Sequence, residues 1–125
     1  MPTTPVLRNY IAGAFSDSAE LHEVRNPATG TLLAQSPLSS QADVDRAIAA
    51  ARGAHRAWAR RPAVERAQYL RRVAARIRDN AARIARTITE EQGKVLGLAE
   101  VEVNFTADYL DYMAEWARRI EGEVI

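Results

Sequence analysis

Large apolar side chains recur every three or four residues along the last stretch of the chain, residues 95–125. This spacing places them on one face of a helix: Leu98, Val101, Phe105, Tyr109, Tyr112, Trp116 and Ile120. A second row on the same helix comprises Thr106, Leu110, Met113 and Ala117. A helix with two such faces needs cover from several directions, and the rest of the chain is too small and too polar to provide it all. We expect this helix to be a central element of something larger.

The N-terminal part shows short alternating runs bounded by turn residues, which is typical of strands. Residues 8–15 predict a strand, a tight turn at Gly13 and the start of a return strand, with further strands at 22–25 and 31–36. Residues 26–30, Asn-Pro-Ala-Thr-Gly, predict a turn, because Asn and Gly tolerate positive φ and Pro keeps the residue before it out of the helical region. So few short strands are only marginally stable alone, and they need a partner surface.

Helical spacing begins after residue 40. Ser40 is expected to cap the first helix, with Asp43 three positions later in a near capping box. The helix is expected to reach Arg60. Its apolar stripe comprises Val44, Ala47, Ile48, Ala51, Ala54 and Trp58.

Two further helices are predicted before the last one. Pro62 is expected in the first turn of the second helix. The predicted buried face of that helix comprises Val64, Ala67, Leu70, Val73, Ala74 and Ile77. Asp79-Asn80 is expected to break it, and a third short helix ends at Gln92, where Gly93 is a natural stop.

The composition narrows the class of protein. With 47% hydrophobic and 26% charged residues in 125 positions, the chain has the character of one soluble globular domain. No apolar run is long enough to span a membrane, and residues 1–7 show no secretory signal, so we expect a cytoplasmic location. The absence of cysteine excludes disulfides, Cys-ligated metals and a cysteine nucleophile within these residues.

Charge is unevenly distributed along the chain. Residues 45–86 carry twelve Arg and three acids, whereas residues 87–125 carry nine acids and three basic residues. One interpretation is that the basic helices dock against the acidic one. The alternative is a stand-alone helical module that binds nucleic acid or an acidic partner through Arg52, Arg56, Arg60, Arg66, Arg71 and Arg78. Aromatic residues are sparse among these arginines, so no stacking platform for bases is predicted.

Little catalytic chemistry is visible in the residues themselves. The six glycines are too scattered for a dinucleotide fingerprint or a phosphate loop. Neither His22 nor His55 has a carboxylate or serine at a useful spacing. From residue chemistry alone, the chain is a mostly helical, unfinished domain without an active site of its own.

Four stretches in order, however, carry a resemblance: residues 10–15 (YIAGAF), 24–30 (VRNPATG), 41–51 (QADVDRAIAAA) and 91–94 (EQGK). Together they resemble the N-terminal segment of the aldehyde dehydrogenase superfamily, and the match covers essentially the whole chain. Arg25 stands where a valine or similar residue is more usual. Residues 98–119 are similar to the lactaldehyde and glycolaldehyde dehydrogenase branch.

The resemblance implies an incomplete α/β aldehyde dehydrogenase-like fold, mostly α in this segment, with a short N-terminal β-hairpin region. Residues 1–125 would form the N-terminal part of the NAD-binding and catalytic region of an enzyme several hundred residues long. In that family a cysteine attacks the aldehyde, a hydride passes to NAD and a glutamate activates the releasing water. The catalytic cysteine, the oxyanion asparagine and the NAD-binding strands would all lie beyond residue 125, so no catalytic or cofactor-binding residue is expected here, and the segment alone should be inactive.

The resemblance also implies site residues and partners. Phe105 matches a position that reaches the aldehyde tunnel, with Tyr109 behind it. The backbone carbonyls of Val24 and Arg25, with the Glu91 carboxylate, match positions that hold a monovalent cation in some relatives. The expected partners are a small hydroxyaldehyde, the remainder of the dehydrogenase chain and further subunits in a homo-dimer or tetramer, without nucleic acid or membrane.

Overall fold

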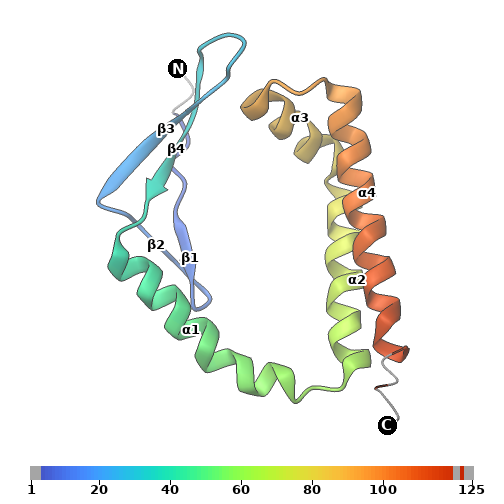
Figure 1. Ribbon diagram of the computed structural model, residues 1–125. Helices are drawn as coiled ribbons and strands as arrows, with labels where there is room; N and C mark the ends of the chain where they lie inside the picture. Colours follow the sequence, from blue (N-terminus) through green and yellow to red (C-terminus); the bar gives the residue numbers. More distant parts are fainter. Residues whose placement is uncertain (1–3, 120–121, 123–125) are drawn as a thin grey trace. The chain divides into compact units, whose positions relative to one another are not determined.

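The computed structural model describes residues 4–119 and 122, so Ile120 of the predicted apolar row lies outside the described residues. Short antiparallel strands precede four helices, and the segment is mostly helical, as predicted (Figure 1). The chain divides into two compact units. The first unit comprises residues up to 60 together with 90–93, and the second comprises 61–89 with the residues from 94 onward.

Two antiparallel strand pairs form the start of the first unit. Strand β1 (Asn9–Ile11) pairs with β2 (Ala14–Ser16), and β3 (Glu20–Arg25) pairs with β4 (Leu32–Leu38). The first pair turns through Ala12 and Gly13, both at positive φ, a geometry that suits the twist of a two-residue hairpin. The second pair turns through Asn26, whose side-chain oxygen accepts a hydrogen bond of 2.9 Å from the Ala28 amide. Both predicted turns are confirmed.

Helix α1 (Gln41–Ala59) completes the first unit, together with the end of α3. Ser40 is its N-cap, and the capping box with Asp43 is fully formed, as predicted. No residue of α1 is buried within the described residues, and Val44 and Ile48 of its apolar stripe remain exposed. The stripe is therefore formed but largely uncovered.

The second unit is built on α2 (Ala63–Asp79) and α4 (Leu96–Glu115), which lie side by side (Figure 1). Their buried residues are almost all small: Ala67 and Ala74 on α2, and Ala99, Val103, Ala107 and Ala114 on α4. Helix α3 (Ala81–Gln92) adds Ala85, which packs with Ala99 and Val103 against half-buried isoleucines. A seam of alanines lets two helix backbones approach closely, so this unit gains its packing from small side chains.

Three predictions for this unit need correction. The face predicted as buried on α2 includes Val64 and Val73, which are exposed in this structure because α4 packs on the alanine row beside them. Pro62 is the N-cap of α2, one position before the predicted first turn. The last α-helix ends at Glu115, and a 3₁₀ turn η1 (Trp116–Arg118) follows, so the predicted regular helix does not continue through Trp116.

Two predicted stops are confirmed. The side-chain amide of Asn80 donates to the Arg76 carbonyl at 2.8 Å, and Asn80 separates α2 from α3. Gly93, directly after α3, has a φ of 73°, a left-handed conformation that ends helices and favours glycine.

Candidate functional site

The most prominent chemical feature of α4 and the η1 turn that follows it is a row of exposed aromatic rings. Phe105 and Tyr109, the predicted channel residues, are 67% and 49% exposed, and their ring centroids lie 6.3 Å apart in a stacked arrangement. Tyr112 continues the row at 6.3 Å from Tyr109, and Trp116 meets Tyr112 edge-on at 6.4 Å. The structure brings the two predicted residues together on a surface open to a further layer.

This aromatic row (Phe105, Tyr109, Tyr112 and Trp116) lies on a face other than the alanine seam that contacts α2. The spacing of large apolar residues predicted this row but not the buried row of Ala99, Val103, Ala107 and Ala114. The overlooked signal was the four-residue spacing of small side chains from 99 to 107. Small buried residues on one face contact α2 and α3, and large exposed residues on another face leave room for a further layer on α4.

The predicted cation ligands lie in the first unit. Val24 pairs with Ala34 and Arg25 pairs with Leu32, so the ladder skips Leu33 and its register breaks between the two predicted carbonyl ligands. Such an irregularity disrupts strand pairing locally and can leave carbonyls without a ladder partner. The Arg25 guanidinium is held aside by Glu23 at 2.7 Å and by the Gly30 carbonyl at 2.9 Å.

Glu91, the third predicted ligand, lies in the last turn of α3 and is exposed. A Cβ placed on Gly93 would lie 3.3 Å from the Pro27 ring, so the end of α3 passes close to the turn that follows Arg25. Two carbonyls and one carboxylate are hard oxygen donors, which suits a monovalent cation better than a transition metal. Within residues 4–119 there is no group of three or more His, Cys, Asp or Glu side chains placed to share a metal.

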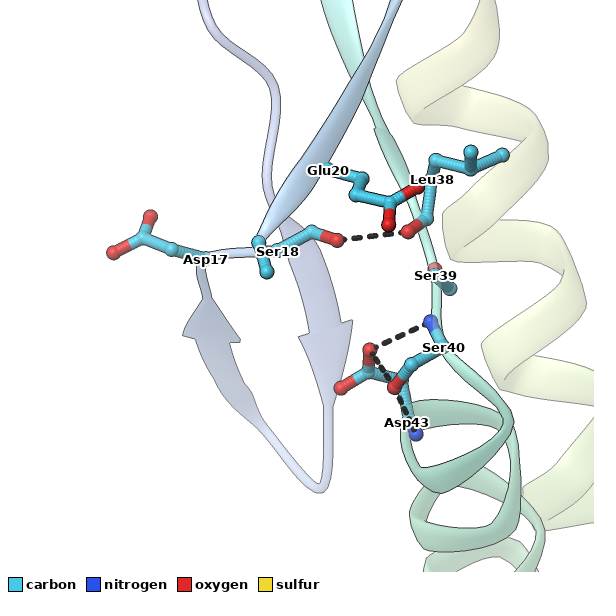
Figure 2. Close-up of a pocket in the computed structure, with 8 residues that line it drawn as sticks. Asp17, Ser18, Glu20, Leu38, Ser39, Ser40 and Asp43 are labelled. Carbon is cyan, nitrogen blue, oxygen red and sulfur yellow. Dashed lines mark hydrogen bonds between the residues drawn. The ribbon is translucent and has the colours of Figure 1, made fainter.

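A polar hollow of about 430 Å³ lies in the first unit, between the β2–β3 connection and the start of α1 (Figure 2). Its lining residues are Asp17, Ser18, Ala19, Glu20, Leu38, Ser39, Ser40 and Asp43. Ser18 donates to the Leu38 carbonyl at 2.9 Å, and the Asp43 carboxylate accepts from the Ser40 hydroxyl at 2.7 Å and from its amide at 2.9 Å. These bonds serve the strand end and the helix cap, so the hollow holds no reactive arrangement.

The hydrogen bonds from Ser40, with a smaller contribution from the Arg46 guanidinium, hold the pKa of Asp43 below its ordinary value of 3.8. A carboxyl with a lowered pKa stabilises the fold above its unfolded-state pKa and loses that contribution as pH falls through the folded-state pKa. We therefore expect Asp43→Asn to lower the urea midpoint at pH 6 and to lose this effect at an acidic pH below the folded-state pKa of Asp43. Glu20→Gln, in the same hollow but outside the cap, is the control. An Asp43→Asn deficit that is the same at both pH values would contradict the account.

Charge pairing between the helices decides between the two interpretations of the basic segment. Arg78 on α2 bridges Asp108 at 2.7 Å and Asp111 at 2.8 Å on α4. These hydrogen bonds raise the pKa of Arg78, the bond to Asp108 contributing most. One of the arginines assigned to a nucleic-acid surface is thus paired with the acidic helix, as the docking interpretation predicted.

Within residues 4–119, no helix combines the length and apolarity that crossing a bilayer requires.

Comparison with known proteins agrees with the observed fold. The aldehyde dehydrogenase family model matches residues 15–125. The chain is 52% identical over 103 residues to lactaldehyde dehydrogenase of Escherichia coli (strain K12), covering 82% of this chain and 22% of that protein. The crystal structure of lactaldehyde dehydrogenase from Escherichia coli superimposes with a TM-score of 0.95 at 46% identity, over 98% of this chain and 26% of that one.

A second solved structure, of 3,6-anhydro-L-galactose dehydrogenase in complex with NAP, superimposes with a TM-score of 0.90 at 33% identity, over 96% of this chain and 26% of that one. The chain belongs to the aldehyde dehydrogenase family. It spans about a quarter of the length of the relatives it matches.

Proposed function

We propose that residues 1–125 act as the N-terminal part of the NAD-binding and catalytic region of an aldehyde dehydrogenase. The reaction is the NAD-dependent oxidation of a small hydroxyaldehyde, such as lactaldehyde or glycolaldehyde, to its acid. The observation that carries this proposal is the 52% identity to a lactaldehyde dehydrogenase. Because one relative was solved with NAP, the test includes NADP as well as NAD.

The segment's own contribution is structural and steric. It contains no cysteine, so the nucleophile belongs to the rest of the enzyme. Its exposed α1 stripe and α4 aromatic row supply apolar surface for the cofactor-binding layers, and burying that surface excludes water from the site. We place the complete enzyme in the cytoplasm and expect it to be a homo-dimer or tetramer. Sedimentation of the intact enzyme as a monomer would contradict the expected oligomeric state.

The test uses a grafted enzyme, in which this chain replaces the superimposed segment of Escherichia coli lactaldehyde dehydrogenase. NADH and NADPH formation are followed with lactaldehyde, glycolaldehyde and a bulky aromatic aldehyde. The proposal predicts the largest kcat/KM for a small hydroxyaldehyde with NAD. A graft that prefers the aromatic aldehyde would contradict the substrate assignment. The cofactor assignment is tested on the intact enzyme, where a preference for NADP would contradict it.

Within this proposal, Phe105 and Tyr109 line the entrance of the substrate. Phe105 is the most exposed ring of the row and carries no polar group, so it can contact an aldehyde without binding it strongly. We expect Phe105→Ala in the grafted enzyme to change kcat/KM ratios between small and bulky aldehydes by roughly tenfold, the scale of one apolar contact. Val101→Ala, one turn earlier on the same helix, is the matched control. An unchanged substrate profile for Phe105→Ala would refute the assignment.

We also propose that the carbonyls of Val24 and Arg25 and the Glu91 carboxylate hold a monovalent cation. The register break at Val24–Arg25 and the approach of α3 to the following turn support this site. A cation there would fasten the end of α3 to β3 and take no part in the chemistry. We expect potassium to raise the thermal midpoint of the grafted enzyme and Glu91→Gln to remove that effect, while Glu90→Gln keeps it. An equal potassium effect in both variants would contradict the site.

A further inference from the structure

A shallow groove at the junction of α2 and α3 lies outside the proposed substrate entrance and cation site. It has a volume of about 360 Å³ and lies wholly within the second unit. Its floor consists of Val73 and Ile77 from α2 and Ile84 from α3, and Val73 is 49% exposed. The floor forms because Asn80 breaks the helix, which places Ile84 beside the last turns of α2.

Three arginines, Arg72, Arg76 and Arg83, form the rim of this groove. Arg76 meets Asp79 at 3.7 Å, with both side chains mostly exposed, and Arg83 makes one long contact of 3.5 Å with the Asn80 side-chain oxygen. The guanidinium of Arg72 lies 4.2 Å from the centroid of the Tyr69 ring. Among the described residues, Asp79 is the one carboxylate that forms an ion pair with this rim, so the rim carries excess positive charge.

Arg78, on the same helix as Arg72 and Arg76, is paired differently from the rim arginines. Arg78 is neutralised by two carboxylates of α4, Asp108 and Asp111. Among the described residues, acids of α4 pair with α2 on the side that packs internally, whereas Asp79 is the one carboxylate that pairs with the rim of the groove. A surface with an apolar floor and uncompensated guanidinium groups complements a ligand that carries apolar surface between carboxylates.

We propose that this groove docks an acidic segment of a partner protein. One large apolar side chain of the partner rests on Val73, Ile77 and Ile84, and carboxylates on either side of it bind Arg72, Arg76 and Arg83. Arginine is enriched among residues that dominate binding energy, and an apolar anchor between charged flanks is a common form of interface core. The proposal is independent of the dehydrogenase assignment.

Two other ligands fit the groove less well. A polynucleotide binds through stacked aromatic platforms and phosphate contacts, but the aromatic ring beside this rim, Tyr69, is already stacked with Arg72. A small anion would not use the apolar floor. An acidic protein segment uses both the floor and the rim.

The test is fluorescence anisotropy with the 125-residue chain and a labelled synthetic peptide, in which one leucine stands between two pairs of glutamates in a glycine–serine frame. We expect saturable binding that weakens by roughly tenfold or more when NaCl rises from about 0.05 M to about 0.3 M. Replacing the leucine by glycine should weaken it by a similar factor. A peptide that does not bind, or binds equally well without its leucine, would overturn the proposal.

Matched variants locate the binding site. Arg72→Gln with Arg83→Gln should abolish measurable binding, while Arg52→Gln with Arg56→Gln, which removes the same charge from α1, should preserve it. All four arginine side chains are exposed. Val73→Ser is a further variant, which changes the apolar floor of the groove and leaves its charge intact. If both double variants lose peptide binding equally, the peptide is held by diffuse charge attraction and not by this groove, which would contradict the proposal.

Two further outcomes would also overturn the proposal. The first is tighter binding of a single-stranded oligonucleotide to the groove, and the second is a dimer that the Arg72→Gln/Arg83→Gln pair dissociates.

Discussion

Replacing Trp116 by alanine in the grafted enzyme is expected to lower the free energy of unfolding by about 3–5 kcal/mol. Within this chain the indole is 44% exposed and contacts Tyr112 edge-on, so part of its apolar surface has no neighbour. In the complete enzyme we expect that surface to be buried, and truncation would then remove the buried contacts and leave a cavity. The loss is measured by denaturant unfolding of the grafted enzyme.

Two comparisons make this result specific. The same substitution in the 125-residue chain should cost clearly less, because the side chain is already half-exposed there. Arg118→Ala, in the same 3₁₀ turn, should change stability by less than about 0.5 kcal/mol in either context. A Trp116→Ala loss well under about 1 kcal/mol in the grafted enzyme would show that α4 is not the central element proposed here.

The second large effect is expected from Ala74→Leu, which should destabilise the 125-residue chain by about 1–3 kcal/mol. Ala74 is fully buried on α2, in the seam of small residues that contacts α4. Extra carbons there must push the two helices apart, and this also strains the bridges from Arg78 to Asp108 and Asp111. The measurement is urea unfolding followed by circular dichroism.

Ala75 provides a matched control for this substitution. It is the next residue along α2 and is exposed, so Ala75→Leu should change the unfolding free energy by less than about 0.5 kcal/mol. The two variants have the same composition and helix propensity. Equal stability of the two would show that α2 and α4 do not pack closely through their alanines.

Features fixed by neighbouring residues could be predicted from the sequence. The Ser40–Asp43 box, the Asn26 turn and the stop at Gly93 each depend on a hydrogen bond or a φ angle within a few positions. The family resemblance was also correct, because it rests on local motifs in a fixed order, and the family model confirms it.

Features that depend on tertiary neighbours could not be predicted. The large apolar residues predicted which face of α4 needs to be covered, but the face that is buried inside this chain is the one with Ala99 and Ala107. Burial follows from which partner helix is available, and small residues give a weak hydrophobic signal while allowing the closest approach. The end of α4 at Glu115 could not be predicted either, because neither glycine nor proline directly follows that residue. The groove between Val73 and Ile84 arises from two segments whose juxtaposition depends on the bend at Asn80.

The roles of Phe105, Tyr109, Val24, Arg25 and Glu91 remain predictions. The structure shows the rings exposed together and the strand register broken between Val24 and Arg25, and both observations support the proposed sites. Their function depends on groups outside this chain, which local sequence reasoning does not supply.

The most direct test of the central claim is the kcat/KM of the grafted enzyme for lactaldehyde with NAD. If this chain is a working aldehyde dehydrogenase segment, the graft should retain activity within roughly tenfold of the parent enzyme, because the backbones superimpose closely and the catalytic groups come from the rest of the enzyme. A graft that folds and assembles like the parent, but whose kcat/KM is indistinguishable from that of a variant lacking the catalytic cysteine, would contradict the account.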